Sequence, residues 1–296
     1  MTGDEAAPVC YRHTDRETFV SCTRCEKPIC PDCMRSASVG FQCPDCVKQG
    51  AKSMRPIKAA YGGRARTAPY VTYGLIAVNL LMLAITSTTN SLLSGDVTNG
   101  VFRRLALVPS ATTLALSEDS STVLHGVAGG EYYRLVTSMF LHFGVIHLLL
   151  NMFTLQRLGP RLEQAFGQVR FLALYLLSGL GGSALSYAFG DPHEIAAGAS
   201  GAVFGLFGAY YLYERKTNSE FDTVTLVVAL NLLFSFTVPN IDLRAHVGGL
   251  LVGAAIGWVV MWSPDTKQRT AYQAVGILVV AVLVVGLIAA RTAQLA

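Results

Sequence analysis

The sequence contains few charged residues, and its long apolar runs contain almost none. Only 14% of the 296 residues are charged, whereas 52% are hydrophobic. The charges cluster between the apolar runs, which excludes an ordinary water-soluble domain and indicates a polytopic membrane protein. The first apolar run begins near Pro69, so we expect no cleavable signal peptide and a separate soluble module in residues 1–50.

Seven apolar segments predict the transmembrane helices of an all-α polytopic membrane protein. They are residues 70–89, 139–156, 171–189, 198–213, 223–238, 245–262 and 272–290. We expect a basic juxtamembrane linker in residues 51–68, a six-helix core in 69–262 and an additional C-terminal transmembrane helix in 263–296. The connection over residues 90–138 is long and lacks strong apolar periodicity, so we expect it to pack on the membrane face.

The distribution of basic residues predicts the orientation of these helices. If the N-terminus is inside, the inner loops carry Arg157, Arg161, Arg170, Arg215, Lys216, Lys267 and Arg269, and the outer side keeps Arg103, Arg104, Arg134, Arg244 and Arg291. The positive-inside rule therefore favours a cytoplasmic N-terminus and, with seven spans, a C-terminus outside the cell. We predict the plasma membrane as the location.

The net charge of +4 is small, and the basic residues before the first apolar segment form one juxtamembrane cluster. It consists of Lys48, Lys52, Arg55, Lys58, Arg64 and Arg66. A basic cluster beside a membrane helix is typical of segments that bind anionic lipid. We therefore expect anionic lipid near residues 48–66, and no nucleic-acid partner.

The sequence has no cysteine after residue 46. Its seven cysteines and one histidine form four pairs with two residues between the members: Cys10 and His13, Cys22 and Cys25, Cys30 and Cys33, Cys43 and Cys46. Because each pair can reach one tetrahedral ion, the eight side chains satisfy two structural Zn²⁺ ions. A disulfide framework is the alternative, but an odd number of cysteines and a reducing cytoplasm argue against it. Such a module should fold on zinc and then bind an unknown cytoplasmic partner or brace the N-terminus.

The spacing by itself leaves the pairing of the ligands open. It resembles the B-box family of cross-braced zinc fingers, which usually ends in two histidines where this sequence has Cys43 and Cys46. The resemblance implies two ligand sets. They are Cys10, His13, Cys30 and Cys33 for one ion, and Cys22, Cys25, Cys43 and Cys46 for the other.

Four polar residues are predicted to lie together near the outer leaflet. Ser200 and His246 each stand near the start of an apolar segment, and His147 and Asn151 lie early in another. Polar side chains in a membrane are costly unless they are paired or functional. A helical rise of about 1.5 Å per residue from Ser200 to Glu214 places the hydroxyl group about 9 Å below the outer surface of the apolar layer.

Small residues at matching positions predict close packing of the two segments that carry Ser200 and His246. They are Gly201, Gly205 and Ala209 on one segment, and Gly249, Gly253 and Gly257 on the other. Such stripes let two helix backbones approach in lipid. The alternative is that the glycines are packing contacts only and the serine is a polar bridge, but a histidine at the matching depth favours a catalytic pair.

The chemistry of these residues predicts an acyl-transfer site. Ser200 needs a base to become a nucleophile, and His246 is the plausible base in the same layer. His147 and Asn151 lie four residues apart on one helix face and can donate hydrogen bonds to an oxyanion, as can the backbone N–H of Ser200. The apolar segments contain no lysine, no aspartate pair and no H-E-x-x-H motif, so other classes of intramembrane protease are excluded, and we expect no cofactor for catalysis.

These motifs resemble the rhomboid intramembrane serine proteases over residues 69–262. The resemblance is carried by the sequences HFGVIHLLLN at 142–151, GASG at 198–201 and AHVGG at 245–249. It implies a six-helix core with Ser200 as nucleophile, His246 as base, and His147 and Asn151 in the oxyanion hole. It also implies that His142 supports the site and that Phe204 packs on His246. The resemblance also makes Tyr133 and Arg134 the counterpart of the family's Trp-Arg signature, with tyrosine in place of tryptophan.

The predicted activity is hydrolysis of peptide bonds in membrane-anchored proteins near the outer face. An intact helix shields its carbonyl groups, so we expect substrates with weakly helical transmembrane segments. The alternative is a catalytically silent rhomboid-like protein that binds client helices, with the zinc module recruiting them. A transporter would show an inverted repeat, and the sequence shows no convincing one.

Overall fold

The computed structural model describes residues 7–53, 59–63, 68–87, 98–117, 120–217, 226 and 241–295. The chain divides into two compact units, Met1–Pro56 and Ile57–Ala296. The predicted module boundary at residue 50 falls inside a helix that continues to Ser53. The limits of the predicted domains stay predictions, and the first compact unit ends at Pro56.

The N-terminal unit is built around its cysteines rather than around a large apolar core. It contains η1 (Pro31–Cys33), a two-stranded antiparallel sheet of β1 (Arg35–Ser36) and β2 (Phe41–Gln42), and α1 (Pro44–Ser53). Its buried cluster consists of Ile29 and six of the seven cysteines. Without bound metal this unit would have little to hold it together, because so few large apolar side chains are buried.

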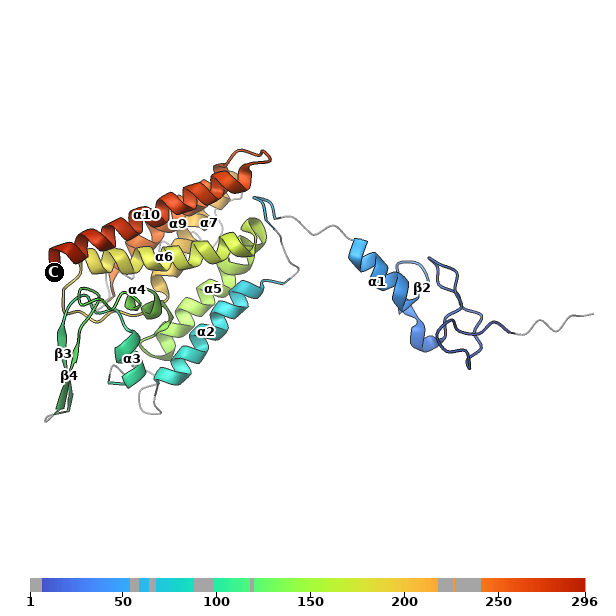
Figure 1. Cartoon of the computed structure of the whole chain (residues 1–296), viewed down its shortest axis with the longest axis horizontal. Coiled ribbons are helices and arrows are strands. Elements are labelled where there is room, and N and C mark those ends of the chain that lie inside the picture. The colour runs from blue at the N-terminus through green and yellow to red at the C-terminus, as the bar shows by residue number, and fades with distance from the viewer. Residues whose placement is uncertain are drawn as a thin grey trace, which may run out of the picture. The chain divides into compact units, whose positions relative to one another are not determined.

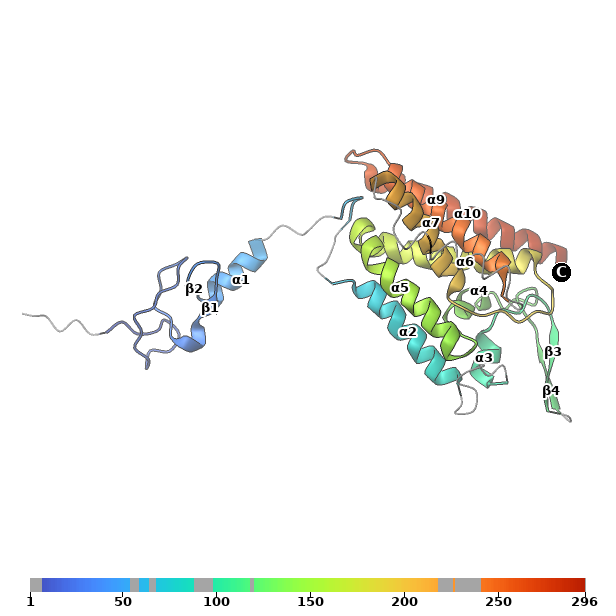
Figure 2. The same ribbon diagram turned by 180° about the vertical axis from the view of Figure 1, so that it is seen from behind.

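The second unit is a bundle of long helices (Figures 1 and 2). Its main helices are α2 (Tyr70–Thr86), α5 (Gly144–Phe166), α6 (Gln168–Phe189), α7 (Ser200–Thr217), α9 (Leu243–Trp262) and α10 (Arg269–Leu295). Helices α6, α7 and α9 pack closely on one another, while α2 packs mainly on α5. The buried core therefore lies around α6 and α7, and the other helices surround it.

The helices agree with the predicted apolar segments but are mostly longer. Among the described residues, three helices are long and apolar enough to cross a membrane, and a fourth span results if the bent segment Arg134–Phe140 and α5 count together. Helix α5 continues ten residues past the predicted end at 156, through Pro160, because helices extend beyond the apolar layer. The predicted segment 223–238 lies outside the described residues, apart from Leu226.

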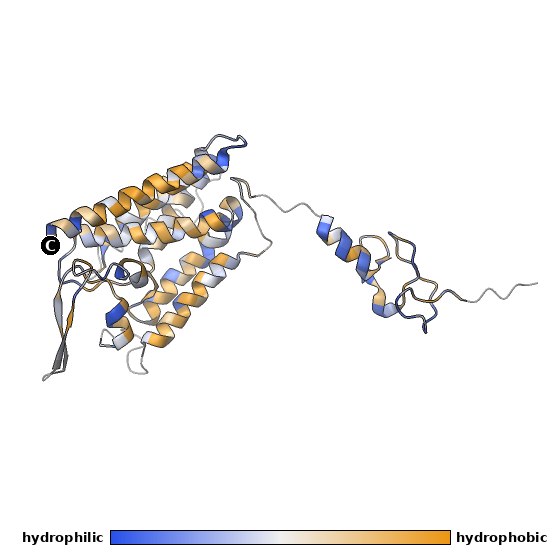
Figure 3. Ribbon diagram, viewed as in Figure 1, coloured by the Kyte–Doolittle hydropathy of each residue, from blue (hydrophilic) through white to orange (hydrophobic). Residues whose placement is uncertain are grey.

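Helix α10 is the most apolar and least buried of the candidate spans. Only 17% of its most apolar stretch of 18 residues is buried inside the protein. Figure 3 shows apolar residues along most of the helix. Such a surface would be unstable in water and is suited to contact with lipid tails. Helix α10 contacts α6 and α9, so the predicted additional C-terminal helix packs directly on the core.

The long connection after α2 is folded, which the sequence did not resolve in detail. It contains α3 (Gly100–Leu105), a hairpin of β3 (Thr112–Ser117) and β4 (Ser120–Leu124), α4 (Arg134–Thr137) and η2 (Ser138–Phe140). The hairpin was not predicted. Asn99 caps α3 by accepting hydrogen bonds from Val101 N and Phe102 N.

Glu163 and Gln273 hold together the end of the bundle where α2 and α10 begin and α5 ends. Buried Glu163 on α5 accepts hydrogen bonds from Val71 N and Thr72 N at 3.1 and 2.9 Å, so its carboxylate caps the positive N-terminus of α2. Buried Gln273 on α10 donates to the carbonyl oxygens of Tyr61 and Val260. The short segment 59–63 before α2 is thereby held against α9 and α10.

Candidate functional site

In the second unit, Ile57–Ala296, which we call the membrane unit, one cavity of about 660 Å³ is lined by the four predicted site residues, Ser200, His246, His147 and Asn151. Ser200 is the first residue of α7, His246 lies in the first turn of α9, and His147 and Asn151 lie in the first two turns of α5. Three helices that begin far apart in the sequence thus present their first turns to one space. The structure thus brings the four residues together, while their depth in the membrane stays a prediction.

Close backbone contact between α7 and α9 sets the level of Ser200 relative to His246. A Cβ atom on Gly249 would overlap the backbone of Gly201, and one on Gly253 would overlap that of Gly205. Further along, a Cβ on Gly257 would lie 2.9 Å from the Cα of Ala209. The two predicted stripes of small residues therefore meet in register, which is the contact that such stripes allow.

The His246 ring is buried and stacked on an aromatic neighbour. Its centroid lies 4.1 Å from that of Phe204, with an angle of 13° between the ring planes, as the family resemblance implied. His246 is 6% exposed, so its ring has little freedom to turn. Phe204 lies about one turn after Ser200 on α7, so α7 supplies both the serine and the surface that orients the histidine.

His147 is oriented by the turn that precedes α5. Phe143 N donates a hydrogen bond to His147 Nδ1 at 3.4 Å, so the neutral ring carries its hydrogen on Nε2. The His147 ring also lies parallel to the ring of Phe143, at an angle of 7°. A Cβ atom at Gly198 would lie 3.1 Å from His147 Nε2 and 3.6 Å from Ser200 Oγ, so both groups border the backbone at Gly198.

Gly198 has a backbone conformation that favours glycine. Its φ angle is +144°, and its N–H donates to the carbonyl oxygen of Ser138 at 2.9 Å. A side chain at this position would meet the His147 ring. The glycine therefore keeps open the space between His147 and Ser200.

Asn151 retains a hydrogen-bond donor for the cavity. Its Nδ2 donates to the carbonyl oxygen of His147 at 2.8 Å, which uses one of the two amide hydrogens. The side chain is 5% exposed and lines the cavity. His142, predicted to support the site, is buried and its ring centroid lies 5.2 Å from that of His147.

The sequence did not predict the polar network at the start of α9. Asp242 caps the helix by accepting from Arg244 N and Ala245 N, and Ser186 Oγ on α6 donates to its carboxylate. Arg244 also donates to Glu194 Oε2 at 2.9 Å, in the loop that leads to Ser200. The network joins the helix of His246 to the loop before Ser200. Asp242 stands three residues before the predicted segment 245–262, and an aspartate shortly before a helix is a capping signal that could have indicated part of this network.

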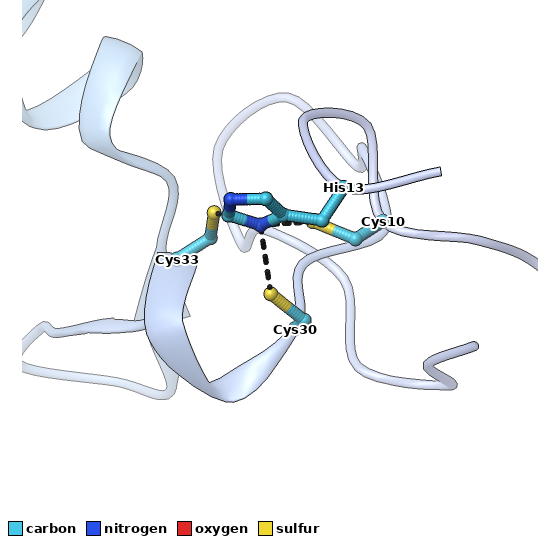
Figure 4. A group of neighbouring side chains, drawn as sticks. All are labelled: Cys10, His13, Cys30 and Cys33. Carbon is cyan, nitrogen blue, oxygen red and sulfur yellow. Dashed lines mark hydrogen bonds between the residues drawn. The ribbon is translucent and has the colours of Figure 1, made fainter. Parts of the chain in front are cut away.

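The first group that could hold a metal ion combines residues from two of the predicted pairs. Cys10, His13, Cys30 and Cys33 point their ligand atoms toward one another (Figure 4). His13 Nδ1 lies 3.9, 3.2 and 3.5 Å from the sulfur atoms of Cys10, Cys30 and Cys33. A tetrahedral zinc ion with ordinary bond lengths would separate nitrogen from sulfur by about 3.6 Å. The four side chains therefore fit such an ion.

The second group consists of Cys22, Cys25, Cys43 and Cys46. The sulfur atoms of Cys25 and Cys43 lie 3.7 Å apart, close to the separation of about 3.8 Å expected in a zinc-tetrathiolate site. Cys43 N donates to the sulfur of Cys22 at 3.2 Å. The structure thus brings together the same two sets of four residues that the B-box resemblance implied as ligands, and their binding of metal stays a prediction.

Hydrogen bonds and burial shift the pKa values of the thiols in these groups in both directions. Burial raises the pKa of Cys10, but backbone N–H groups that donate to its sulfur outweigh this effect and lower the pKa to about 6. This favours the thiolate, which is the form that binds metal. The pKa of Cys46 is raised to about 12 by the hydrogen bond with Cys25 and by burial, since another negative charge among these sulfurs is unfavourable. A divalent cation would remove that cost.

Comparisons with known proteins agree with this geometry. Residues 129–263 match the rhomboid domain family. RHOMBOID-like protein 6, mitochondrial, from Arabidopsis thaliana is 34% identical over 225 residues, which cover 69% of this chain and 73% of that protein. The chain belongs to the rhomboid family.

Other rhomboid relatives are similar over smaller parts of their length. RHOMBOID-like protein 5 from Arabidopsis thaliana is 42% identical over 148 residues, which cover 47% of each chain. Rhomboid protease GluP from Bacillus subtilis is 34% identical over 199 residues, which cover 64% of this chain and 35% of that protein. The matched residues 129–263 include the four predicted site residues, Ser200, His246, His147 and Asn151, and exclude the N-terminal unit with its cysteines.

Arg134, which the family resemblance paired with Tyr133 as the counterpart of the Trp-Arg signature, holds parts of the first long connection together. Arg134 is 2% exposed and donates to Glu131 Oε2 at 2.7 Å. It also donates to the carbonyl oxygens of Arg103 and Ala106 at 2.6 and 2.8 Å. The arginine thus fixes the end of α3 against the segment that leads to α5.

Proposed function

We propose that this rhomboid is an intramembrane serine endopeptidase that cleaves membrane-anchored proteins with Ser200 and His246. The observation that carries the proposal is the cavity in which Ser200, His246, His147 and Asn151 meet at the first turns of three helices. The similarity to a protein named as a rhomboid protease supports the reaction class. The alternative function is that of a catalytically silent protein that binds client helices in the same cavity.

In the proposed reaction, Ser200 Oγ attacks the carbonyl carbon of a peptide bond while His246 takes the hydroxyl proton. The C–N bond then breaks, and His246 gives the proton to the leaving amine. Water subsequently attacks the acyl-serine ester, with His246 again accepting and returning a proton, which releases the acid and restores the serine. Stacking on Phe204 keeps the imidazole in place through both steps.

The oxyanion formed in both steps would lie beside His147, Asn151 and the N–H of Ser200. His147 would donate from Nε2, because Nδ1 already accepts the hydrogen bond from Phe143 N. Asn151 would donate the amide hydrogen that the His147 carbonyl group leaves free. Donors whose orientation is fixed in advance stabilise developing charge more than donors that must reorient.

The proposed substrates are transmembrane proteins with weakly helical segments near the outer boundary of the membrane. The cavity is lined largely by apolar side chains, including Ile146, Leu150 and Phe207, which suits an unwound membrane segment. We further propose the plasma membrane, with the N-terminus in the cytoplasm and the C-terminus outside. The relative named as mitochondrial makes an organelle membrane the alternative to be tested by localisation.

We propose that the N-terminal unit binds two Zn²⁺ ions, one in each four-residue group. Four sulfur or nitrogen ligands leave no open position on the ion, so these sites would stabilise the fold and take no part in hydrolysis. An unidentified cytoplasmic partner remains the proposed ligand of this unit. Anionic lipid near residues 48–66 also remains a proposal, and residues 54–58 and 64–67 lie outside the described part of the chain.

Labelling with a fluorophosphonate tests for an activated serine. The native protein should be labelled, whereas Ser200→Ala and His246→Ala should not be. Ser183→Ala is the matched control, because Ser183 lines the same cavity and should be dispensable for labelling. No labelling of a folded native protein, or equal labelling of Ser200→Ala, would contradict the proposed hydrolysis and favour the client-binding alternative.

A further inference from the structure

A second cavity, of about 270 Å³, lies away from Ser200 between α3, β4 and the segment that precedes α5. Its lining includes Arg103 and Arg104 of α3, together with Glu131, Tyr133 and Arg134. Among the described residues that line it, three are basic and one is acidic. The reaction proposed above does not use this cavity.

The single acid of the cavity is already neutralised. Glu131 Oε2 accepts hydrogen bonds from Arg134 Nε and Gly126 N at 2.7 and 2.9 Å, and Oε1 accepts from the hydroxyl group of Tyr133 at 3.2 Å. Burial raises the pKa of Glu131, but the hydrogen bonds from Arg134 and Gly126 N outweigh it, so the pKa lies below the usual value. Glu131 is therefore committed to Arg134 and cannot balance the other arginines.

Arg134 has donor capacity left over. Its Nε and Nη1 atoms donate to Glu131, Arg103 O and Ala106 O, while Nη2 has no hydrogen-bond partner among the residues that the structure describes. Since the side chain is 2% exposed, it cannot turn away into bulk solvent. A buried guanidinium group at the wall of a polar cavity is a fixed donor for an anion.

Among the described residues that line the cavity, none balances the charge of Arg103 and Arg104. Arg103 Nη1 donates to a neutral group, the carbonyl oxygen of Thr98, at 2.7 Å. Exposed Arg104 makes no hydrogen bond or ion pair within the described ranges. Two adjacent cations beside a neutralised pair produce a local positive potential that attracts an anion.

The surroundings of the cavity indicate a lipid as the source of that anion. Tyr132, Tyr133 and Val136 are 48%, 47% and 43% exposed, and Val101 on α3 is 38% exposed. Tyrosines and apolar side chains beside arginines are typical of protein surfaces at the level of lipid headgroups. The segment leads directly into the first turn of α5, where His147 lies, so the cavity belongs to the end of the bundle that holds Ser200.

We propose that this cavity binds the phosphate group of an anionic membrane lipid. Arg104 and Arg103 would neutralise the phosphate, and Arg134 Nη2 would donate a hydrogen bond to one of its oxygens. A headgroup without its own cation, such as phosphatidylglycerol, fits best, because a choline group would be repelled by the two arginines. The site is distinct from the juxtamembrane cluster at residues 48–66, which precedes the N-terminal end of α2.

The test measures the thermal unfolding midpoint of the full-length protein in a neutral detergent while phosphatidylglycerol is added. The native protein should be stabilised in a saturable way, and phosphatidylcholine should stabilise it less. Arg104→Gln should need about fivefold more phosphatidylglycerol for half of the shift, as expected for the loss of one arginine at a membrane surface. Arg104→Lys should retain most of the response. Arg215→Gln removes an exposed arginine at the last turn of α7 and is the matched control.

Three results would overturn the proposal. The first is a response of Arg104→Gln equal to that of Arg215→Gln, which would show only general attraction between basic protein and anionic lipid. The second is equal protection by soluble glycerol phosphate at the same concentration, which would assign the cavity to a soluble phosphate ester. The third is a lipid response unchanged by Arg104→Gln together with a raised KM for a substrate that has acidic residues outside its membrane segment. That result would assign the cavity to substrate binding.

Discussion

Single residues orient the side chains of the cavity through a hydrogen bond, a ring stack and a missing side chain. Phe143 N fixes the His147 ring, and Phe204 fixes the His246 ring. Gly198 keeps the space between His147 and Ser200 free of a side chain. Preorganisation of this kind lowers the barrier because few groups must reorient when charge develops.

Asn151 provides a direct test of the proposed oxyanion site. Asn151→Ala should lower kcat on the order of a hundredfold with little change in KM, because one donor to the oxyanion is lost. Thr154→Val is the control. It removes a different buried polar group, the hydroxyl of Thr154, which also lines the cavity on α5, and it should change kcat only slightly. If Asn151→Ala hydrolysed substrate at the native rate, its proposed role would be wrong even with Ser200 and His246 intact.

The pair of Glu131 and Arg134 should make stability depend on pH. The pKa of folded Glu131 lies below the usual value, chiefly because hydrogen bonds from Arg134 and Gly126 N overcome the effect of burial. The stabilisation is therefore complete above the unfolded-state pKa of about 4.3 and is lost as the pH falls through the folded-state pKa. The native unfolding midpoint should fall more steeply below about pH 4.3 than that of Glu131→Gln, which cannot titrate. Parallel curves for the two proteins would contradict this.

At the scale of secondary-structure elements, the contact between α7 and α9 determines whether Ser200 and His246 meet. Gly205 and Gly253 allow the two backbones to touch at the middle of this contact. Lipid tails provide no hydrophobic force to hold the two helices together, so the contact depends on close packing. A single methyl group at the wrong position should therefore separate them.

Gly253→Ala should destabilise the protein by about 1–3 kcal/mol, because its Cβ would overlap the backbone of Gly205. Fluorophosphonate labelling of Ser200 should slow at the same time, as His246 moves away with α9. Gly286→Ala on α10 is the matched control, since no atom lies within 4 Å of the added Cβ. Equal unfolding midpoints for the two variants would show that the close contact has no energetic role.

At the scale of the whole molecule, two units use different means of stabilisation. The membrane unit has an extensive apolar core, whereas the core of the N-terminal unit is mainly sulfur atoms arranged in two ligand groups. Binding of structural zinc supplies free energy of folding in such small units. Metal removal should therefore affect the two units unequally.

A strong chelator should remove two zinc ions per chain and unfold residues 7–53, while the membrane unit remains folded. Proteolysis and thiol alkylation would report the unfolding of the N-terminal unit, and fluorophosphonate labelling would report the state of Ser200. His13→Cys keeps four ligands and should retain both ions, whereas His13→Ala should weaken one site. Metal analysis that finds one zinc ion or fewer per native chain would contradict the proposal of two sites.

The sequence alone determined the membrane class, most helix positions and the identity of the cavity residues. Apolar runs are local signals, and Ser200, His246, His147 and Asn151 stood out because polar groups are rare in them. The spacing of the cysteines likewise predicted two metal groups. The ends of the helices were predicted less accurately than their positions. Helix α5, for example, ends at Phe166 rather than at residue 156, because a helix can continue past the apolar layer through charged residues.

Only the tertiary structure decided how distant segments meet. It resolved which cysteine pairs share a site, and it revealed the hairpin of β3 and β4, the network of Ser186, Asp242, Arg244 and Glu194, and the cavity beside Arg104. The hairpin joins two strands that follow one another closely in the sequence, whereas the other features depend on side chains from segments separated by many residues along the chain. No periodicity or spacing encodes such contacts, because packing of the whole bundle determines which loops lie side by side.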